Sequence, residues 1–177
     1  ADFGWEVKSA EDRLVIFSER IETLRWLREH LTADLKLKPN QLEVLHGQMA
    51  DTEQQELVER FGRLDDPLRI LLCSDVASEG LNLHYFCHRL VHFDLPWSLM
   101  VFQQRNGRVD RHGQARDVYV YHFTSDDEAD LKFLAFVVKK VEQARESLAP
   151  ETPVIAQGAY IETVQDYNTY IRKFPVN

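Results

Sequence analysis

Four arginines fall within fourteen residues of this chain, and their spacing is the clearest chemical signal in the sequence. The stretch QQRNGRVDRHGQAR, residues 103–116, sets these arginines against one aspartate in a chain whose formal net charge is -8. A helix that begins near Ser98 is expected to run through it. On such a helix Gln104, Arg108 and Arg111 share one face, because positions i, i+4 and i+7 coincide at 3.6 residues per turn. Two guanidiniums and an amide on one face suit a polyphosphate whose negative charge grows during phosphoryl transfer.

The alternative is an ordinary pair of solvated arginines that acidic neighbours neutralise, which is the more frequent fate of an isolated R-x-x-R spacing. Gly107 between the arginines and the His-Gly-Gln sequence after them, residues 112–114, make the pattern more specific than a chance pair. The sequence therefore favours a ligand-facing role for these side chains.

The segment QRNGRVDRHGQ, residues 104–114, resembles motif VI of superfamily 2 helicases and translocases, and its ending RHGQ resembles the Swi/Snf-type branch. In that family the motif lies in the second RecA-like lobe and supplies arginine fingers to ATP held by the first lobe. The resemblance implies that Arg111 is the principal finger and Arg108 its partner on the phosphates. Gln104 is implied to be a supporting polar contact. The preceding SLMVFQQR departs from the family, where an Asn-Pro and an acidic residue precede the glutamine.

A second candidate segment, SDVASEGLNL at residues 74–83, directly follows an apolar run expected to be a buried strand. In open α/β sheets, ligands bind at the carboxyl ends of the strands. The segment resembles motif V, which implies that Gly80 and Asn82 lie toward the nucleotide and Ser74 toward a nucleic-acid phosphate. A residue without Cβ also lets the backbone approach a ligand closely. The alternative is an ordinary strand-to-helix turn.

Two further segments resemble motifs that touch the sugar-phosphate backbone in the same family. LVIFSER, residues 14–20, resembles motif IV, and the His-Gly of LEVLHGQM resembles a neighbouring motif. The implied nucleic-acid contacts are Ser18, Arg20, His46 and Gly47. Such contacts position a strand without reading its sequence, so sequence-independent binding is expected. Taken singly, each segment is more often a plain turn.

The stretch HRLVHFDLPW resembles the connection between motifs V and VI, in which Asp94 and Trp97 are expected to brace the sheet edge. Four nearby side chains raise the question of zinc, namely His84, Cys87, His88 and His92. Their spacing matches no usual zinc pair set, so no metal site is expected in this chain.

The 177 residues contain no G-x-x-x-x-G-K-[ST] phosphate loop. Their one Asp-Glu pair, Asp127 and Glu128, falls at an expected acidic helix start, so no Asp-Glu box that holds magnesium is expected. A complete ATPase site is therefore not expected here, and the chain alone is predicted to be inactive. ATP is the expected cofactor, with Mg²⁺ held by an N-terminal RecA-like lobe of the same protein.

The elements that position these segments are expected to alternate along the chain. Strands are predicted at residues 14–17, 42–47, 69–75, 89–96 and 118–123, and helices at residues 18–31, 51–61, 98–111 and 125–148. For the second helix, Asp51 is the expected N-cap, Gln54 its capping-box partner and Gly62 the terminator. The alternation predicts an α/β fold with three layers and a mainly parallel central sheet, which is the architecture of a RecA-like lobe.

The expected domain organisation is a lead-in over residues 1–12, one RecA-like domain over residues 13–150 and an extension over residues 151–177. Helical spacing of apolar residues in the extension predicts a helix that docks on the lobe or on a protein partner; these residues are Ile161, Val164, Tyr167 and Ile171. The abrupt start without methionine is consistent with an excised fragment.

Composition limits the remaining possibilities. A net charge of -8 and an isoelectric point near 5.4 argue against a general polyanion binder, so nucleic-acid contacts are expected to be local. Cys73 and Cys87 are expected to be reduced thiols, and no apolar run approaches the roughly 20 residues needed to cross a bilayer. A cytoplasmic, nucleoid-associated bacterial protein with no membrane partner is expected.

The function implied by the resemblance is the second motor lobe of a DNA-stimulated translocase or helicase acting on double-stranded DNA, similar to bacterial RNA polymerase-associated ATPases and phage-defence helicases. Three alternatives stay open. They are a DEAD-box-like RNA helicase lobe, a non-catalytic interaction module on the same scaffold, and an unrelated doubly wound binder of nucleotides or sugar phosphates.

Overall fold

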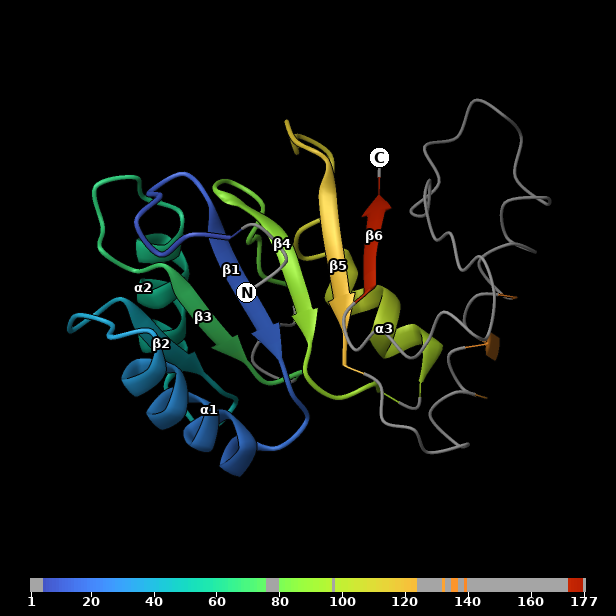
Figure 1. Cartoon of the computed structure of the whole chain (residues 1–177), viewed down its shortest axis with the longest axis horizontal. Coiled ribbons are helices and arrows are strands. Elements are labelled where there is room, and N and C mark those ends of the chain that lie inside the picture. The colour runs from blue at the N-terminus through green and yellow to red at the C-terminus, as the bar shows by residue number, and fades with distance from the viewer. Residues whose placement is uncertain are drawn as a thin grey trace.

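A computed structural model describes residues 5–75, 80–96 and 98–123, together with residues 132, 135, 136, 139 and 172–176 (Figure 1). The elements are β1 (Arg13–Phe17), α1 (Ile21–Asp34), β2 (Leu42–Leu45), α2 (Asp51–Phe61), β3 (Ile70–Cys73), β4 (Cys87–His92), α3 (Leu99–Asn106), β5 (Val118–His122) and β6 (Arg172–Val176). The five predicted strands are thus present in the predicted order.

The strands form one sheet in the order β2-β3-β1-β4-β5-β6, with β1 in its interior. The first five strands are parallel, and in the register Val15 of β1 lies beside Leu71 of β3 and Leu90 of β4. Every residue of β1 and β3 is buried, as continuous apolar runs in a parallel sheet require. The sequence did not predict β6, which pairs antiparallel with β5.

Helices cover both faces of this sheet, which confirms the predicted three-layer α/β fold. On one face, Leu24 and Leu27 of α1 pack in a cluster with apolar side chains of the strands. On the other face, Leu57 and Phe61 of α2 pack in a second cluster that includes Val109 from the segment after α3. The segments that carry the candidate site residues therefore begin and end at elements packed in these two apolar clusters.

The start of α2 differs from the capping prediction by one residue. Ala50 is the N-cap, and its N–H donates to Oε2 of Glu53 at 3.2 Å, whereas Asp51 is already the first helical residue. The side-chain amide of Gln54 instead donates to the carbonyl of Met49 at 3.0 Å. In a capping box the side chain that accepts from the N-cap N–H lies three residues after the cap, so the capping pair here is Ala50 and Glu53. The helix ends before Gly62, as predicted.

The arginine-bearing helix α3 is shorter than predicted, and this corrects the geometry of the site. It ends at Asn106, and the N–H of Gly107 donates to the carbonyl of Gln103 at 2.9 Å to close the last turn. Arg108 and Arg111 lie beyond the helix, so they share no helical stripe with Gln104. After the helix, the chain buries Val109 in the core. It then returns to the amino ends of the strands, where β5 starts parallel to β4.

Several predictions concern residues that the structure does not describe. Trp97, most of the helix expected at 125–148 and the tail from residue 151 to Ile171 lie outside the described residues. Arg172 onward is a strand, so the expected tail helix does not continue to Phe174. Within the described residues, no helix is long and apolar enough to cross a membrane.

Candidate functional site

The four candidate phosphate contacts that follow strands lie together at the carboxyl ends of the parallel strands. Ser18 follows β1, His46 and Gly47 follow β2, and Ser74 follows β3. These three strands are parallel neighbours, so their carboxyl ends lie side by side. The Ser74 N–H donates to the carbonyl of Leu45 at 2.9 Å, which ties the ends of β2 and β3 together.

The Ser18 side chain already forms a hydrogen bond within the protein at the carboxyl end of β1. It is buried, and its hydroxyl donates to Oδ2 of Asp94 at 2.5 Å, while the N–H of Glu19 donates to the same oxygen at 2.9 Å. Asp94 thereby links the ends of β1 and β4, in keeping with its expected bracing role. Arg20 is exposed at the start of α1, and its side chain is the more accessible of the two candidates from motif IV.

Ser74 and His46 carry polar atoms that have no hydrogen-bond partner within the described residues. The Ser74 side chain is only 5% exposed, and its Oγ and the Nδ1 of His46 are both buried and unsatisfied. A buried polar group without a partner destabilises the fold, so such groups in a native protein call for an explanation. Ser74 and His46 are therefore candidate ligand contacts at this end of the sheet.

Arg105 is buried and paired with two carboxylates from outside the arginine-rich segment, although that segment itself contains only one aspartate. Its side chain is 1% exposed and makes ion pairs with Asp75 at 2.5 Å and Asp94 at 3.1 Å. Nη1 also donates to the Asp94 carbonyl at 2.9 Å. Arg105 therefore fastens α3 to the ends of β3 and β4.

Arg111 is exposed and is held by a neutral group. Its Nη1 donates to the side-chain oxygen of Asn82, twenty-nine residues earlier in the chain. The backbone joins the same two segments, since the N–H of Leu83 donates to the carbonyl of half-buried Arg108 at 3.0 Å. The amide of Gln114 adds bonds to the carbonyls of His84 at 3.2 Å and Cys87 at 2.9 Å. Motif-V-like and motif-VI-like segments thus form one interlocked unit.

Among the described residues, no carboxylate forms an ion pair with Arg111. Its partner Asn82 is an amide and not a carboxylate, so it orients the guanidinium without neutralising it. Burial and the charge of Arg111 both lower the pKa of His84, which favours the neutral imidazole beside the guanidinium. Gly80 has φ of 79°, a left-handed conformation that favours glycine, and it opens the loop that presents Asn82.

A polar groove of about 1050 Å³ runs between α2 and this loop. Gly80 and Asn82 line one wall, Gln54 and Gln55 of α2 line the other, and Gly47 lies at the carboxyl edge of the sheet. The groove thus connects residues assigned to the nucleotide with a residue assigned to nucleic acid. Gln104, which is exposed on α3, is not among the residues that line the groove, and neither are Arg108 and Arg111.

Buried aromatic and histidine rings stack between α3 and the sheet. This stack was not predicted from the sequence. His92 stacks on Phe102 of α3 at 4.6 Å and on His122 of β5 at 4.8 Å between ring centroids. Burial, with the charge of Arg105, lowers the pKa of His122 to about 3, and burial lowers the pKa of His92 well below its usual value. Both imidazoles are therefore neutral in the folded protein at neutral pH.

This stack predicts a loss of stability in mild acid. In the unfolded chain the two histidines take up protons near pH 6.5, whereas the folded state resists protonation down to about pH 3 for His122. The free energy of unfolding is expected to fall as pH drops below about 6.5, by about 1.4 kcal/mol per pH unit for each histidine. Denaturant unfolding of wild type and His122→Phe between pH 7 and 5 measures this, and equal pH slopes for the two proteins contradict it.

Metal-binding residues do not assemble in the described part of the chain, where no group of three or more His, Cys, Asp or Glu side chains could hold an ion. Cys73 and Cys87 are buried free thiols. Burial raises the pKa of Cys87 to about 12, so its thiolate is disfavoured.

A parallel sheet between helical layers, with polar side chains at the carboxyl ends of its strands, is a doubly wound α/β architecture that RecA-like lobes share. Residues 5–113 match the family model described as helicase conserved C-terminal domain, and the chain belongs to that family. Within it, the chain is a Swi/Snf-type lobe of superfamily 2.

The similar curated proteins are much longer than this chain. The RNA polymerase-associated protein RapA of Vibrio cholerae is 32% identical over 68% of this chain and 12% of its own length. The SNF2 domain-containing protein CLASSY 4 of Arabidopsis thaliana is 29% identical over 69% of this chain and 11% of its own length. The chain thus spans about an eighth or less of these relatives.

Solved structures show the same fold. The C-terminal part of the Fun30 ATPase domain superimposes with a TM-score of 0.61 at 23% identity, covering 72% of this chain and 40% of that one. Domain 2 of the DEAD-box helicase Mss116p, bound to an RNA duplex, superimposes with a TM-score of 0.57 at 24% identity, covering 78% of this chain and 50% of that one.

Proposed function

We propose that this chain is the second motor lobe of an ATP-dependent, DNA-stimulated translocase, and that it supplies arginine fingers to ATP bound by a first lobe. The observation that carries the proposal is the exposed guanidinium of Arg111, oriented by the neutral side chain of Asn82 where two loops interlock. Guanidiniums aimed from one lobe into a cleft stabilise the charge that develops on the transferred phosphoryl group. Mg²⁺ and the phosphate loop belong to the first lobe.

In this mechanism, closure of the two lobes on ATP brings Arg111 and Arg108 to the phosphates. Asn82 releases or shares the Arg111 guanidinium as phosphate oxygens replace its amide oxygen. Hydrolysis removes the contacts that favour the closed state, and the lobes open. Alternation between the two states moves the lobe along a strand that is held at the carboxyl edge of the sheet.

The nucleic-acid track is proposed to run over Arg20, His46, Gly47 and Ser74. The buried, unsatisfied atoms of His46 and Ser74 support this role because a backbone phosphate supplies the hydrogen bonds they lack. Contacts to phosphates carry no sequence information, so binding is expected to be independent of sequence. The rival polymer is RNA, as in the DEAD-box lobe that shares this fold.

The function is tested by ATPase assays on the complete protein that contains this lobe. Duplex DNA is expected to stimulate turnover more than RNA of equal length. This chain alone is expected to hydrolyse no ATP above background, because its sequence has no phosphate loop. Turnover by the purified chain contradicts the proposal, and stronger stimulation by RNA assigns the lobe to the rival class.

Ser74→Ala provides a test of the track. The variant is expected to raise the DNA concentration for half-maximal stimulation about tenfold, because a hydrogen bond to a charged phosphate is lost. Its unfolding free energy is not expected to fall, since the hydroxyl makes no bond within the described residues. Thr32→Ala on the exposed face of α1 is the matched control. Unchanged stimulation, or lost stability without any DNA effect, removes Ser74 from the track.

A further inference from the structure

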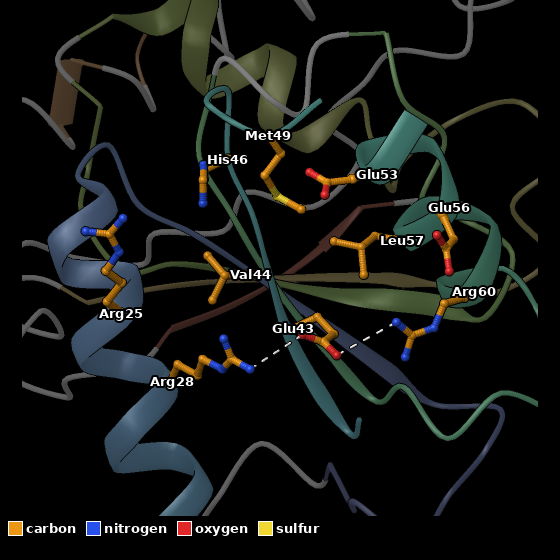
Figure 2. Close-up of a pocket in the computed structure, with 10 residues that line it drawn as sticks. All are labelled: Arg25, Arg28, Glu43, Val44, His46, Met49, Glu53, Glu56, Leu57 and Arg60. Carbon is orange, nitrogen blue, oxygen red and sulfur yellow. Dashed lines mark ion pairs between the residues drawn. The ribbon is translucent and has the colours of Figure 1, made fainter. Parts of the chain in front are cut away.

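A second polar pocket, of about 340 Å³, lies at the free edge of the sheet and away from the interlocked arginine segment (Figure 2). Its floor is β2, represented by Glu43 and Val44. Figure 2 shows α1 on one side of the strand and α2 on the other, each presenting charged side chains toward it. The proposed motor function makes no use of this pocket except for His46 at its upper end.

The backbone of β2 is available for pairing on its outer side. The strand has β3 as its sole neighbour in the described sheet. The carbonyls of Gln41 and Leu45 accept hydrogen bonds from residues at the two ends of β3. Backbone groups alternate in direction along a strand, so the N–H and C=O of Val44 point away from the sheet and into the pocket.

The two walls of the pocket differ in charge, because the α1 side carries Arg25 and Arg28 while the α2 side carries two glutamates and one arginine. On the α1 side, Arg25 is exposed, and Arg28 makes a loose ion pair with Glu43 at 3.7 Å. On the α2 side, Glu53 and Glu56 are exposed. Arg60 on the same helix makes a second loose ion pair with Glu43 at 3.8 Å, as Figure 2 shows. Within the described part of the chain, neither Arg25 nor Glu56 has an ion-pair partner.

We propose that this edge binds an extended peptide of a partner protein in which acidic and basic residues alternate. Such a peptide pairs with β2 as an additional strand, and its main chain satisfies the outward groups of Val44. Because side chains alternate between the faces of a strand, one set meets Arg25 and Arg28 while the other meets Glu53 and Glu56. The glutamates repel a nucleic-acid phosphate, so the charge pattern favours a peptide over a polynucleotide.

Fluorescence anisotropy on the complete protein tests the proposal, with a labelled peptide of four Glu-Lys repeats as the probe. A block peptide of the same composition, with four glutamates followed by four lysines, cannot place opposite charges on opposite faces. It is expected to bind about tenfold more weakly at low ionic strength. The repeat peptide with N-methyl groups at alternate residues keeps its charges but loses its donors, and it is expected not to bind.

Two exposed substitutions check the protein side of the contact. Arg25→Glu and Glu56→Lys are each expected to weaken the repeat peptide about tenfold, whereas Glu29→Lys, on α1 but outside the pocket lining, leaves binding unchanged. Equal binding of the block or methylated peptide overturns the proposal, as does unchanged affinity in both pocket variants. Displacement of the probe by a stoichiometric single-stranded oligonucleotide also overturns it and makes the pocket a phosphate site.

Discussion

Replacing Arg111 by alanine in the complete protein is expected to lower kcat for ATP hydrolysis by about 10³-fold or more, while the KM for ATP changes only a few-fold. An arginine finger acts mainly on charge that develops in the transition state, and such residues contribute about 10³–10⁵ in phosphoryl transfer. In the proposed mechanism the first lobe holds most of ground-state ATP, so ATP binding is expected to depend less on Arg111. Steady-state kinetics with saturating duplex DNA measure both constants.

Arg116→Ala is the matched control, because Arg116 is an exposed arginine five residues further along the same segment. It is expected to leave kcat within about two-fold, as surface substitutions away from a site usually do. Arg111→Lys keeps the charge but loses the planar fork, so it is expected to restore little activity. Wild-type turnover by Arg111→Ala removes this residue from the mechanism.

Replacing Arg105 by alanine is expected to reduce the free energy of unfolding by about 3 kcal/mol. Removing one member of a buried ion pair leaves its partners uncompensated, which costs about 3–5 kcal/mol. The carboxylates of Asp75 and Asp94 keep 27% and 34% of their side-chain exposure, so solvent relieves part of that cost. We therefore place the effect at the lower end of the range.

Denaturant unfolding of Arg105→Ala beside Gln103→Ala measures this effect, because Gln103 is exposed on the same helix. The glutamine variant is expected to differ from wild type by less than about 0.5 kcal/mol. In the complete protein the Arg105 variant is also expected to lose ATPase activity at a lower temperature, since α3 leads directly into the segment that carries Arg108 and Arg111. A stability change below about 1 kcal/mol for Arg105→Ala contradicts the structural role assigned to it.

The strands and the first two helices could be predicted because their sequences carry the signals of burial. LVIF and ILLC are continuous apolar runs and became β1 and β3, and the leucine stripe of residues 24–31 became the inner face of α1. The end of α3 was not predictable from periodicity. Gln104, Arg108 and Arg111 have helical spacing, yet tertiary contacts stop the helix before two of them.

Two buried arginines show why charge counting on the sequence misleads. On the sequence, Arg105 and three other arginines stand against a single local aspartate, although Asp75 and Asp94, which follow β3 and β4, turn out to be the partners of Arg105. Arg13 stands at the start of β1, where its guanidinium lies over the rings of Phe61 and Phe86 at 5.6 and 5.5 Å. Burial lowers its pKa to about 10, and the guanidinium donates to backbone carbonyls around the end of α2.

The candidate site residues were named from the sequence, but the hydrogen bonds that join them to one another and to the sheet were not. Asn82 and Arg111 were assigned to different motifs, and their contact depends on how the loop before β4 crosses the segment after α3. The commitment of Ser18 to Asp94 likewise depends on the adjacency of β1 and β4. Contacts between segments of this kind follow from strand order, which the sequence pattern left open.

The most direct measurement is a structure of the complete protein with ADP, magnesium and a phosphoryl transition-state analogue. The account predicts that guanidinium nitrogens of Arg111 and Arg108 lie about 2.7–3.1 Å from oxygen or fluoride atoms of the analogue, with Arg111 drawn from Asn82 toward it. A closed complex in which Arg111 still bonds only to Asn82, and other side chains contact the analogue, contradicts it.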